Sequence, residues 1–240
     1  MLQFYSEIKF IIVTVSQKEW ETMYDRISTF LSKGTRQKNL YTVTVCMFVF
    51  LILEKLFSGI IPGENYLSFS LGPDDLVYVA VYTTVTVLLA VKVRYKFILI
   101  PDSVLFCLKI NTVISGLINL ASVSKVGLIT ELSLIETLTE SIFFSAFLTV
   151  LFIGKLIPGA AKFKRLCPLL CLGILTVCFP ATVTFEALKI FVEEQYYSFP
   201  LHTEIFLFIR AVANEMFLDL PYALLVLLMF FVPHSNLKKK

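Results

Sequence analysis

The sequence predicts an all-α, polytopic membrane protein with six transmembrane helices and an N-terminal interfacial amphipathic helix. Two observations lead to this fold class. The first is composition: 57% of the 240 residues are hydrophobic, only 16% are charged, and the mean hydropathy is +0.81. Soluble domains carry about 25% charged residues, so this chain has too few to cover a surface in contact with water. The second observation is a regular alternation of basic and acidic connections between the apolar runs.

Residues 1–39 form the first element, which is amphipathic and not a span. Its apolar side chains recur at helical spacing: Trp20, Met23, Tyr24, Ile27, Phe30 and Leu31. Charged residues such as Lys18, Glu21 and Asp25 occupy the other faces. This pattern is typical of a helix that lies in the membrane interface with its apolar side down. A short cytosolic helix packed on the bundle would give the same pattern, so both interpretations stay open.

Six apolar runs follow, and each is a candidate for a helix that crosses a hydrocarbon core roughly 30 Å thick. The expected spans are residues 40–61, 76–91, a third from 97 or 103 to 123, about 134–154, 166–185 and 216–233. The fifth is the clearest, because residues 166–185 contain no charge and directly follow a basic cluster. In the third, Pro101 marks either the first turn or a kink.

Lys and Arg collect in alternate connections, which predicts the topology. Sixteen of the 21 lie in the N-terminal segment, between the second and third spans, between the fourth and fifth, and after residue 233. Cytosolic loops are the ones rich in Lys and Arg, so both termini are expected to be cytosolic. The chain then divides into a cytosolic or interfacial segment (1–39), a transmembrane bundle (40–233) and a basic cytosolic tail (234–240).

The third span carries two polar faces. Asp102 and Lys109 are seven residues apart and share one face, whereas Asn111, Ser115 and Asn119 share another. Polar groups within a span are costly to bury in lipid and mark functional or helix-packing positions. The pattern therefore favours either polar contacts between helices or the lining of a solute path.

A second polar region precedes the last span. Glu204, Glu215 and Asp219 fall in a narrow sector of a helix, and Asp219 lies just before Pro221, where freed backbone carbonyls could help to hold a cation. The alternative is an amphipathic segment outside the membrane that packs on the bundle. The candidate residues for a transport path are Asp102, Lys109, Asn111, Asn119, Glu215 and Asp219.

Two further features bear on modification and location. Cys167 lies two residues from Arg165 at the expected cytosolic boundary, a setting where reversible palmitoylation occurs. The chain ends in Lys238, Lys239 and Lys240, which loosely resemble a dilysine retrieval signal and favour the endoplasmic reticulum or another endomembrane. Ordinary packing of the cysteine and anchoring of the last helix by the lysines are the simpler interpretations.

The sequence gives no indication of a catalytic, metal-binding or cofactor-binding site. Only two histidines exist, His202 and His234, and the sequence contains no HExxH or GxSxG motif. We therefore predict no catalytic residue, metal site or cofactor, and no nucleic-acid partner. The favoured function is a non-enzymatic subunit, scaffold or assembly factor of a membrane complex, with the lipid bilayer and other membrane proteins as partners. The alternative is a small solute or ion transporter or channel, and a lipid-modifying enzyme ranks third.

Overall fold

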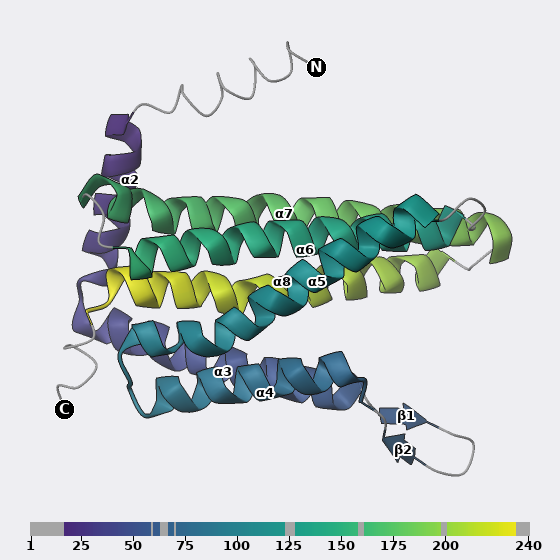
Figure 1. Cartoon of the computed structure of the whole chain (residues 1–240), viewed down its shortest axis with the longest axis horizontal. Coiled ribbons are helices and arrows are strands. Elements are labelled where there is room, and N and C mark those ends of the chain that lie inside the picture. The colour runs from purple at the N-terminus through teal and green to yellow at the C-terminus, as the bar shows by residue number, and fades with distance from the viewer. Residues whose placement is uncertain are drawn as a thin grey trace.

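The computed structural model describes residues 17–58, 60–62, 67–69, 71–122, 128–157, 161–197 and 201–233. This part of the chain is almost entirely helical (Figure 1). Its elements are α2 (Gln17–Leu31), α3 (Gly34–Ser58), β1 (Ile60–Pro62), β2 (Leu67–Phe69), α4 (Pro73–Ala90), η1 (Tyr95–Phe97), α5 (Leu99–Ser122), α6 (Leu128–Leu156), α7 (Ala161–Tyr197) and α8 (Leu201–Phe231).

Five helices in the described ranges are long and apolar enough to cross a membrane. The segments are Gly34–Phe57, Pro73–Ala90, Tyr95–Leu120, Ile129–Leu156 and Arg165–Val192. These correspond to the first five expected spans, and they fit a multi-pass integral membrane protein. The sixth expected span, residues 216–233, falls in α8, whose described residues give a shorter apolar helix, Asp219–Phe231. Five of the six expected spans are therefore confirmed, and the sixth stays a prediction.

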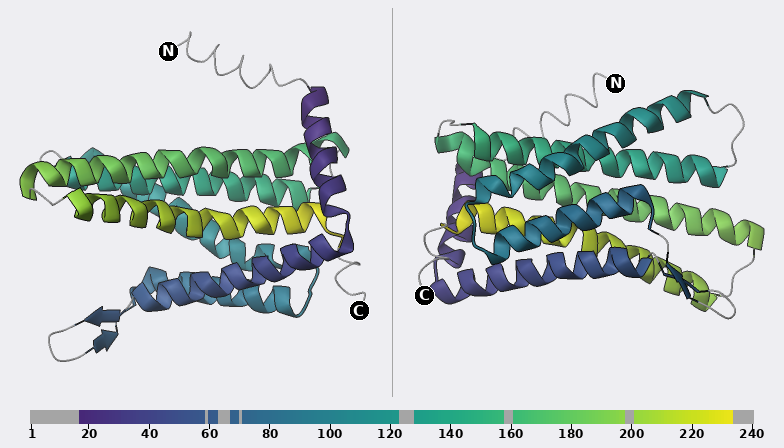
Figure 2. Two further views of the ribbon diagram at one scale, coloured as in Figure 1. Left: turned by 180° about the vertical axis from the view of Figure 1, so that it is seen from behind. Right: turned by 60° about the horizontal axis from the view of Figure 1, so that its bottom comes forward.

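The long helices α3 to α8 run alternately in opposite directions along one bundle (Figures 1 and 2). As a result, α3 begins and α8 ends at the same end of the molecule. The α4–α5 turn, with Lys92, Arg94 and Lys96, lies at this end, and so does the start of α7, with Arg165. Side-chain charges that are scattered in the sequence therefore gather at one end, which we call the basic end.

Helix α2 lies across the basic end of the bundle (Figure 2). It contacts α7, α3 and α8. The ring of Tyr24 is 4.8 Å from the ring of Phe231 at the end of α8, and the guanidinium of Arg165 lies 5.8 Å from the Tyr24 ring. Met23 and Phe30 stay exposed. The helix thus packs on the bundle through one part of its surface and leaves other apolar side chains uncovered.

The structure differs from the sequence-based expectation at several element ends. Helix α5 begins at Leu99, so Pro101 lies in its first turn, where the missing N–H costs nothing. Helix α7 continues to Tyr197, well beyond the expected end at residue 185. The acidic connection after α3 contains a small antiparallel hairpin, in which Ile60 pairs with Phe69 and Pro62 with Leu67. This hairpin is the only β-structure in the part of the chain that the structure describes.

The core of the bundle is built around the aromatic ring of Tyr222, which is 1% exposed. Its centroid lies 5.5 Å from Phe48, 4.9 Å from Phe144 and 5.8 Å from Phe147, all edge to face. These rings come from α3, α6 and α8, and edge-to-face pairs add to the free energy of burial. Tyr222 therefore joins three helices just beside the polar side chains described next.

Candidate functional site: a polar cavity inside the helix bundle

A cavity of about 160 Å³ lies within the bundle beside the Tyr222 cluster. It is lined by Lys55, Tyr78, Tyr82, Lys109, Glu140, Phe144, Cys178, Asp219 and Tyr222. Each of the helices α3 to α8 contributes at least one of these side chains. The cavity has room for several water molecules or a small solute, and its wall carries charges of both signs.

The strongest polar contact in the wall joins α5 to α6. The Nζ of Lys109 donates a hydrogen bond to Oε1 of Glu140 at 2.5 Å. The same ammonium lies 5.6 Å from the Tyr78 ring and 5.7 Å from the Phe144 ring. Lys109 is 8% exposed, so a carboxylate and two ring faces replace most of the water that a lysine normally keeps.

Lys55, in the last turn of α3, adds a second positive charge to the cavity wall. Lys55 lies 3.8 Å from Glu54 and 5.7 Å from the ring of Tyr78. Tyr78 therefore stands between two ammonium groups. Across the cavity, α8 supplies Asp219 next to its internal proline, Pro221. Because proline cannot donate the usual helical hydrogen bond, the backbone carbonyl four residues earlier in α8, that of Phe217, lacks its helical partner.

Asp102 lies deeper in the bundle, on the same face of α5 as Lys109. It is 0% exposed, and neither carboxylate oxygen has a hydrogen-bond partner among the described residues. An ionisable residue buried in a membrane-spanning helix is a functional-site candidate in its own right. Asp102 is not one of the residues that line the cavity.

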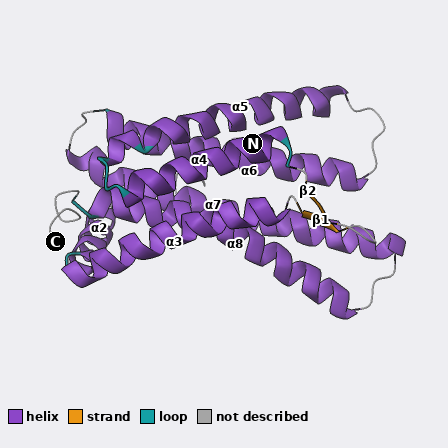
Figure 3. Ribbon diagram, turned by 90° about the horizontal axis from the view of Figure 1, so that it is seen from below, coloured by secondary structure: helices purple, strands orange, loops and turns teal. Residues whose placement is uncertain are grey.

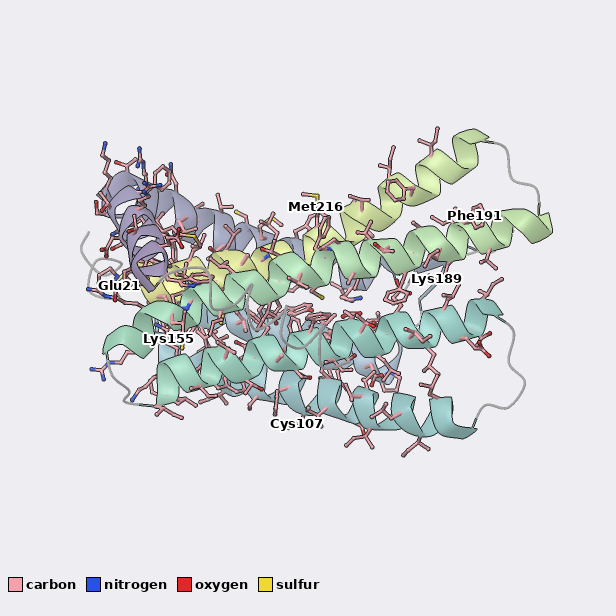
Figure 4. The ribbon with its side chains drawn as sticks, turned by 90° about the horizontal axis from the view of Figure 1, so that it is seen from above. Glu21, Cys107, Lys155, Lys189, Phe191 and Met216 are labelled. Carbon is pink, nitrogen blue, oxygen red and sulfur yellow. The ribbon has the colours of Figure 1, made fainter. Side chains whose placement is uncertain are left out.

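Two other lysines, both half-buried, have structural partners outside the cavity. Lys189 of α7 points toward α6, where its Nζ contacts Glu136 at 2.5 Å, and it contacts Glu186 at 2.8 Å (Figure 4). Lys155 of α6 donates to the backbone carbonyl of Met229, which lies in the last turn of α8. These contacts tie helices together at opposite ends of the bundle.

The structure brings only some of the sequence-predicted residues together. Lys109 and Asp219 line the cavity, and Asp102 is fully buried without lining it. Asn111 and Asn119 are exposed, with Asn111 on the side of α5 opposite Lys109, so the third span does not present all its polar groups to one path. Glu215 lies in α8, and its side chain is outside the described part of the structure.

Neither of the two predicted cytosolic signals is tested by the structure. Cys167 is 0% exposed, and its Sγ would lie 3.0 Å from a Cβ placed on Gly154. Acylation of this thiol therefore requires the side chain to leave its packed position, and the lipidation prediction stays untested. Lys238, Lys239 and Lys240 lie outside the described residues, so the retrieval-signal prediction is also untested.

Sequence reasoning missed most of the cavity wall. The missed residues are Lys55, Tyr78, Tyr82, Glu140, Phe144, Cys178 and Tyr222. Lys55 and Glu140 did carry a signal, because each charge lies within an apolar helix. The tyrosines carried no such signal, since aromatic side chains are common in any apolar span.

Comparison with protein-family models, with characterised proteins and with solved structures finds no match to this chain. The class of protein therefore rests on its own helices, which fit a multi-pass integral membrane protein. Within the described residues, no group of three or more His, Cys, Asp or Glu side chains is arranged to hold a metal ion. The polar cavity is the candidate site that remains.

Cys178 offers a direct test of whether water reaches this cavity, because it is the cysteine in the cavity wall. In membranes that contain a variant with Cys178 as its single cysteine, we expect the small hydrophilic reagent 2-aminoethyl methanethiosulfonate to modify the thiol. The matched control keeps only Cys171, which is fully buried one to two turns earlier on α7, with its Sγ 4.0 Å from the carbonyl of Phe147. Equal rates for the two variants would mean that water does not enter.

Proposed function

We propose that the chain is a small membrane transporter or channel that binds a polar solute or ion in the cavity lined by helices α3 to α8. The observation that carries this proposal is the set of charged side chains, Lys55, Lys109, Glu140 and Asp219, around one cavity in a bundle of membrane-spanning helices. Charges at membrane depth are costly and are retained where they serve a pathway or pair with one another.

The pairing of these charges supports binding over simple packing. Lys109 and Glu140 satisfy each other, and the ring faces of Tyr78 and Phe144 stabilise the cation further. A structural ion pair of this kind needs no space beside it. Here it opens onto a cavity of about 160 Å³, so a solute that carries its own donors and acceptors can exchange contacts with both partners.

The proposal is tested with the full-length chain in liposomes on a solid-supported membrane. Currents are recorded after concentration jumps of sodium chloride, potassium chloride, protons and a panel of zwitterionic amino acids. We expect at least one jump to give a current that Asp219→Asn reduces about tenfold or more, because a hydrogen bond to a charged group contributes about 1.5–3 kcal/mol.

Asp25→Asn is the matched control for this experiment, since Asp25 is exposed on α2, away from the cavity. It should leave the current unchanged. A wild-type protein that carries no current in response to any jump would contradict transport of these solutes. Equal currents from wild type and Asp219→Asn would separate the cavity from the transport path.

A second candidate function, a subunit or scaffold of a membrane complex, is favoured by a different observation. The side chains of Asn111, Ser115 and Asn119 are exposed on the outer side of α5. Polar side chains on membrane helices commonly bond to a neighbouring helix. The protein can therefore have a partner within the membrane whether or not its cavity conducts.

We further propose six spans, with α8 as the last, an interfacial position for α2 and a cytosolic basic end. The basic side chains of the α4–α5 turn and of the start of α7 support this orientation. Exposed Met23 and Phe30 give α2 apolar side chains to insert between headgroups. The endoplasmic reticulum or another endomembrane is the proposed location, on the basic C-terminal residues alone.

The orientation gives a simple expectation for limited proteolysis. A tag fused after Lys240 should be digested by protease added to sealed microsomes with their cytosolic face outward. A tag inserted at the α5–α6 connection should be protected until detergent opens the vesicles. Protection of the C-terminal tag in intact vesicles would contradict the proposed orientation.

A further inference from the structure

Helix α5 presents a row of polar side chains to the outside of the bundle. We call Asn111, Ser115 and Asn119 the outer polar face. All three are exposed, and none has a hydrogen-bond partner among the described residues. Their spacing of four residues keeps them on one side of the helix. At 3.6 residues per turn, Asn111 lies nearly opposite the buried Lys109, whereas Asn119 is turned about 80° from it.

This face lies at membrane depth on the periphery of the bundle. Asn111 and Ser115 lie nine and five residues before the end of the candidate span Tyr95–Leu120, within membrane depth, and Asn119 lies one residue before that end. Helix α5 forms one edge of the bundle when the molecule is seen from below (Figure 3) and from above (Figure 4). Exposed Ile114 and Ile118 lie beside the polar residues. In hydrocarbon, an amide without a partner is costly, because lipid tails offer no hydrogen bonds.

We propose that the outer polar face binds the same face of a second copy of this chain, to form a parallel dimer across α5. Two copies in one membrane share their orientation, so a two-fold axis along the membrane normal brings each α5 residue near its own counterpart. The occupant must then be complementary to itself. A carboxamide meets this requirement, because it carries both donors and an acceptor, and a serine hydroxyl does the same.

Charge and packing favour a second copy over a charged partner helix. The outer polar face has no ionisable side chain, so two copies meet without repulsion. The flanking Ile114 and Ile118 supply apolar contact around the hydrogen bonds, as interfaces between membrane helices require. The proposal does not rest on the cavity. Lys109 is the residue that α5 contributes to the cavity wall, and Asn111 lies on the other side of the helix.

The two exposed native cysteines provide the test. Cys107 lies one turn before Asn111 on the outer side of α5, and Cys46 is exposed on α3. Full-length variants that keep only one of them are oxidised with copper phenanthroline in native membranes. We expect the variant with Cys107 to form a covalent dimer of two chain masses and the variant with Cys46 to stay monomeric.

The outer polar face is then removed in the variant with Cys107. Asn111→Leu combined with Asn119→Leu should lower the cross-linked fraction about fivefold, because polar contacts between membrane helices are lost. A second position, Ser115→Cys in a background without other cysteines, should also cross-link. Light scattering of the wild-type chain in mild detergent gives an independent mass, expected at two chains.

Three outcomes would overturn the proposal. The first is a monomeric mass with no cross-link at Cys107 or at Ser115→Cys. The second is equal cross-linking from Cys107 and Cys46, which indicates random collision. The third is a cross-link to a chain of different mass, which would assign the face to another membrane protein and support the subunit function. None of these outcomes alters the expected currents, so the dimer and the transport function fail separately.

Discussion

Replacing Lys109 with methionine is expected to abolish transport and to destabilise the bundle by about 3 kcal/mol, at the lower end for a broken buried ion pair. The substitution leaves the carboxylate of Glu140 without its 2.5 Å partner and removes the cation from the rings of Tyr78 and Phe144. The lower end applies because the Glu140 side chain keeps 31% of its exposure. The readouts are thermal unfolding in detergent and currents in liposomes.

A double variant distinguishes the two effects of this substitution. Lys109→Met with Glu140→Gln removes both charges, so most of the lost stability should return while transport stays absent. Lys38→Met, at an exposed position in the first turns of α3, is the matched control and should change neither readout. An unchanged unfolding midpoint for Lys109→Met alone would mean that the pair contributes nothing to stability.

Gly154→Val is expected to destabilise the protein by about 3 kcal/mol or more through overpacking. A Cβ at this position would lie 2.8 Å from the Cβ of Cys167 and 2.9 Å from Cζ of Phe230. The Cys167 Cβ is fixed to the backbone of α7, so the new side chain can be accommodated only if α6 moves away from α7. The measurements are folded yield after mild extraction and the unfolding midpoint.

Gly173→Val is the matched control, because a Cβ on Gly173 meets no atom within 4 Å. Both glycines lie inside long helices, so the two substitutions change helix propensity alike and differ in the space around the new side chain. Gly173→Val should therefore give near-normal yield. If the two variants behaved alike, close packing at Gly154 would not explain the loss.

The sequence allowed the bundle to be predicted because membrane helices follow simple rules of length and flanking charge. The five helices that are long and apolar enough to cross a membrane were predicted, and so was the turn with Lys92, Arg94 and Lys96. The end of α7 was predicted too early for a specific reason. Glu186 and Lys189 look like loop residues in sequence, but Lys189 pairs with Glu186 and with Glu136 of α6, and such pairing is invisible until both helices are placed.

The candidate site was predictable only in part, for a related reason. Helical spacing correctly separated Asp102 and Lys109 from Asn111 and Asn119, because positions on one helix depend on local geometry alone. Which of the two faces turns inward depends on neighbouring helices. The cavity itself forms where side chains of α3, α4, α6, α7 and α8 surround Lys109. Its position could not be predicted from any single segment, because it depends on how all these helices pack.

The contacts at the basic end have a consequence for motion. There, three contacts hold α6, α7 and α8 together. The ammonium of Lys155 donates to the Met229 carbonyl and lies 4.0 Å from the Phe230 ring. Gly154 lets α6 approach Cys167 of α7 and Phe230 of α8 closely. At the far end the first half of α8 diverges from α7 (Figures 2 and 3). We therefore expect any movement of α8 to be smallest at the basic end and largest in its first half. On the proposed transport function, solutes are expected to enter from the far end first, and passage through the basic end requires the contacts there to break.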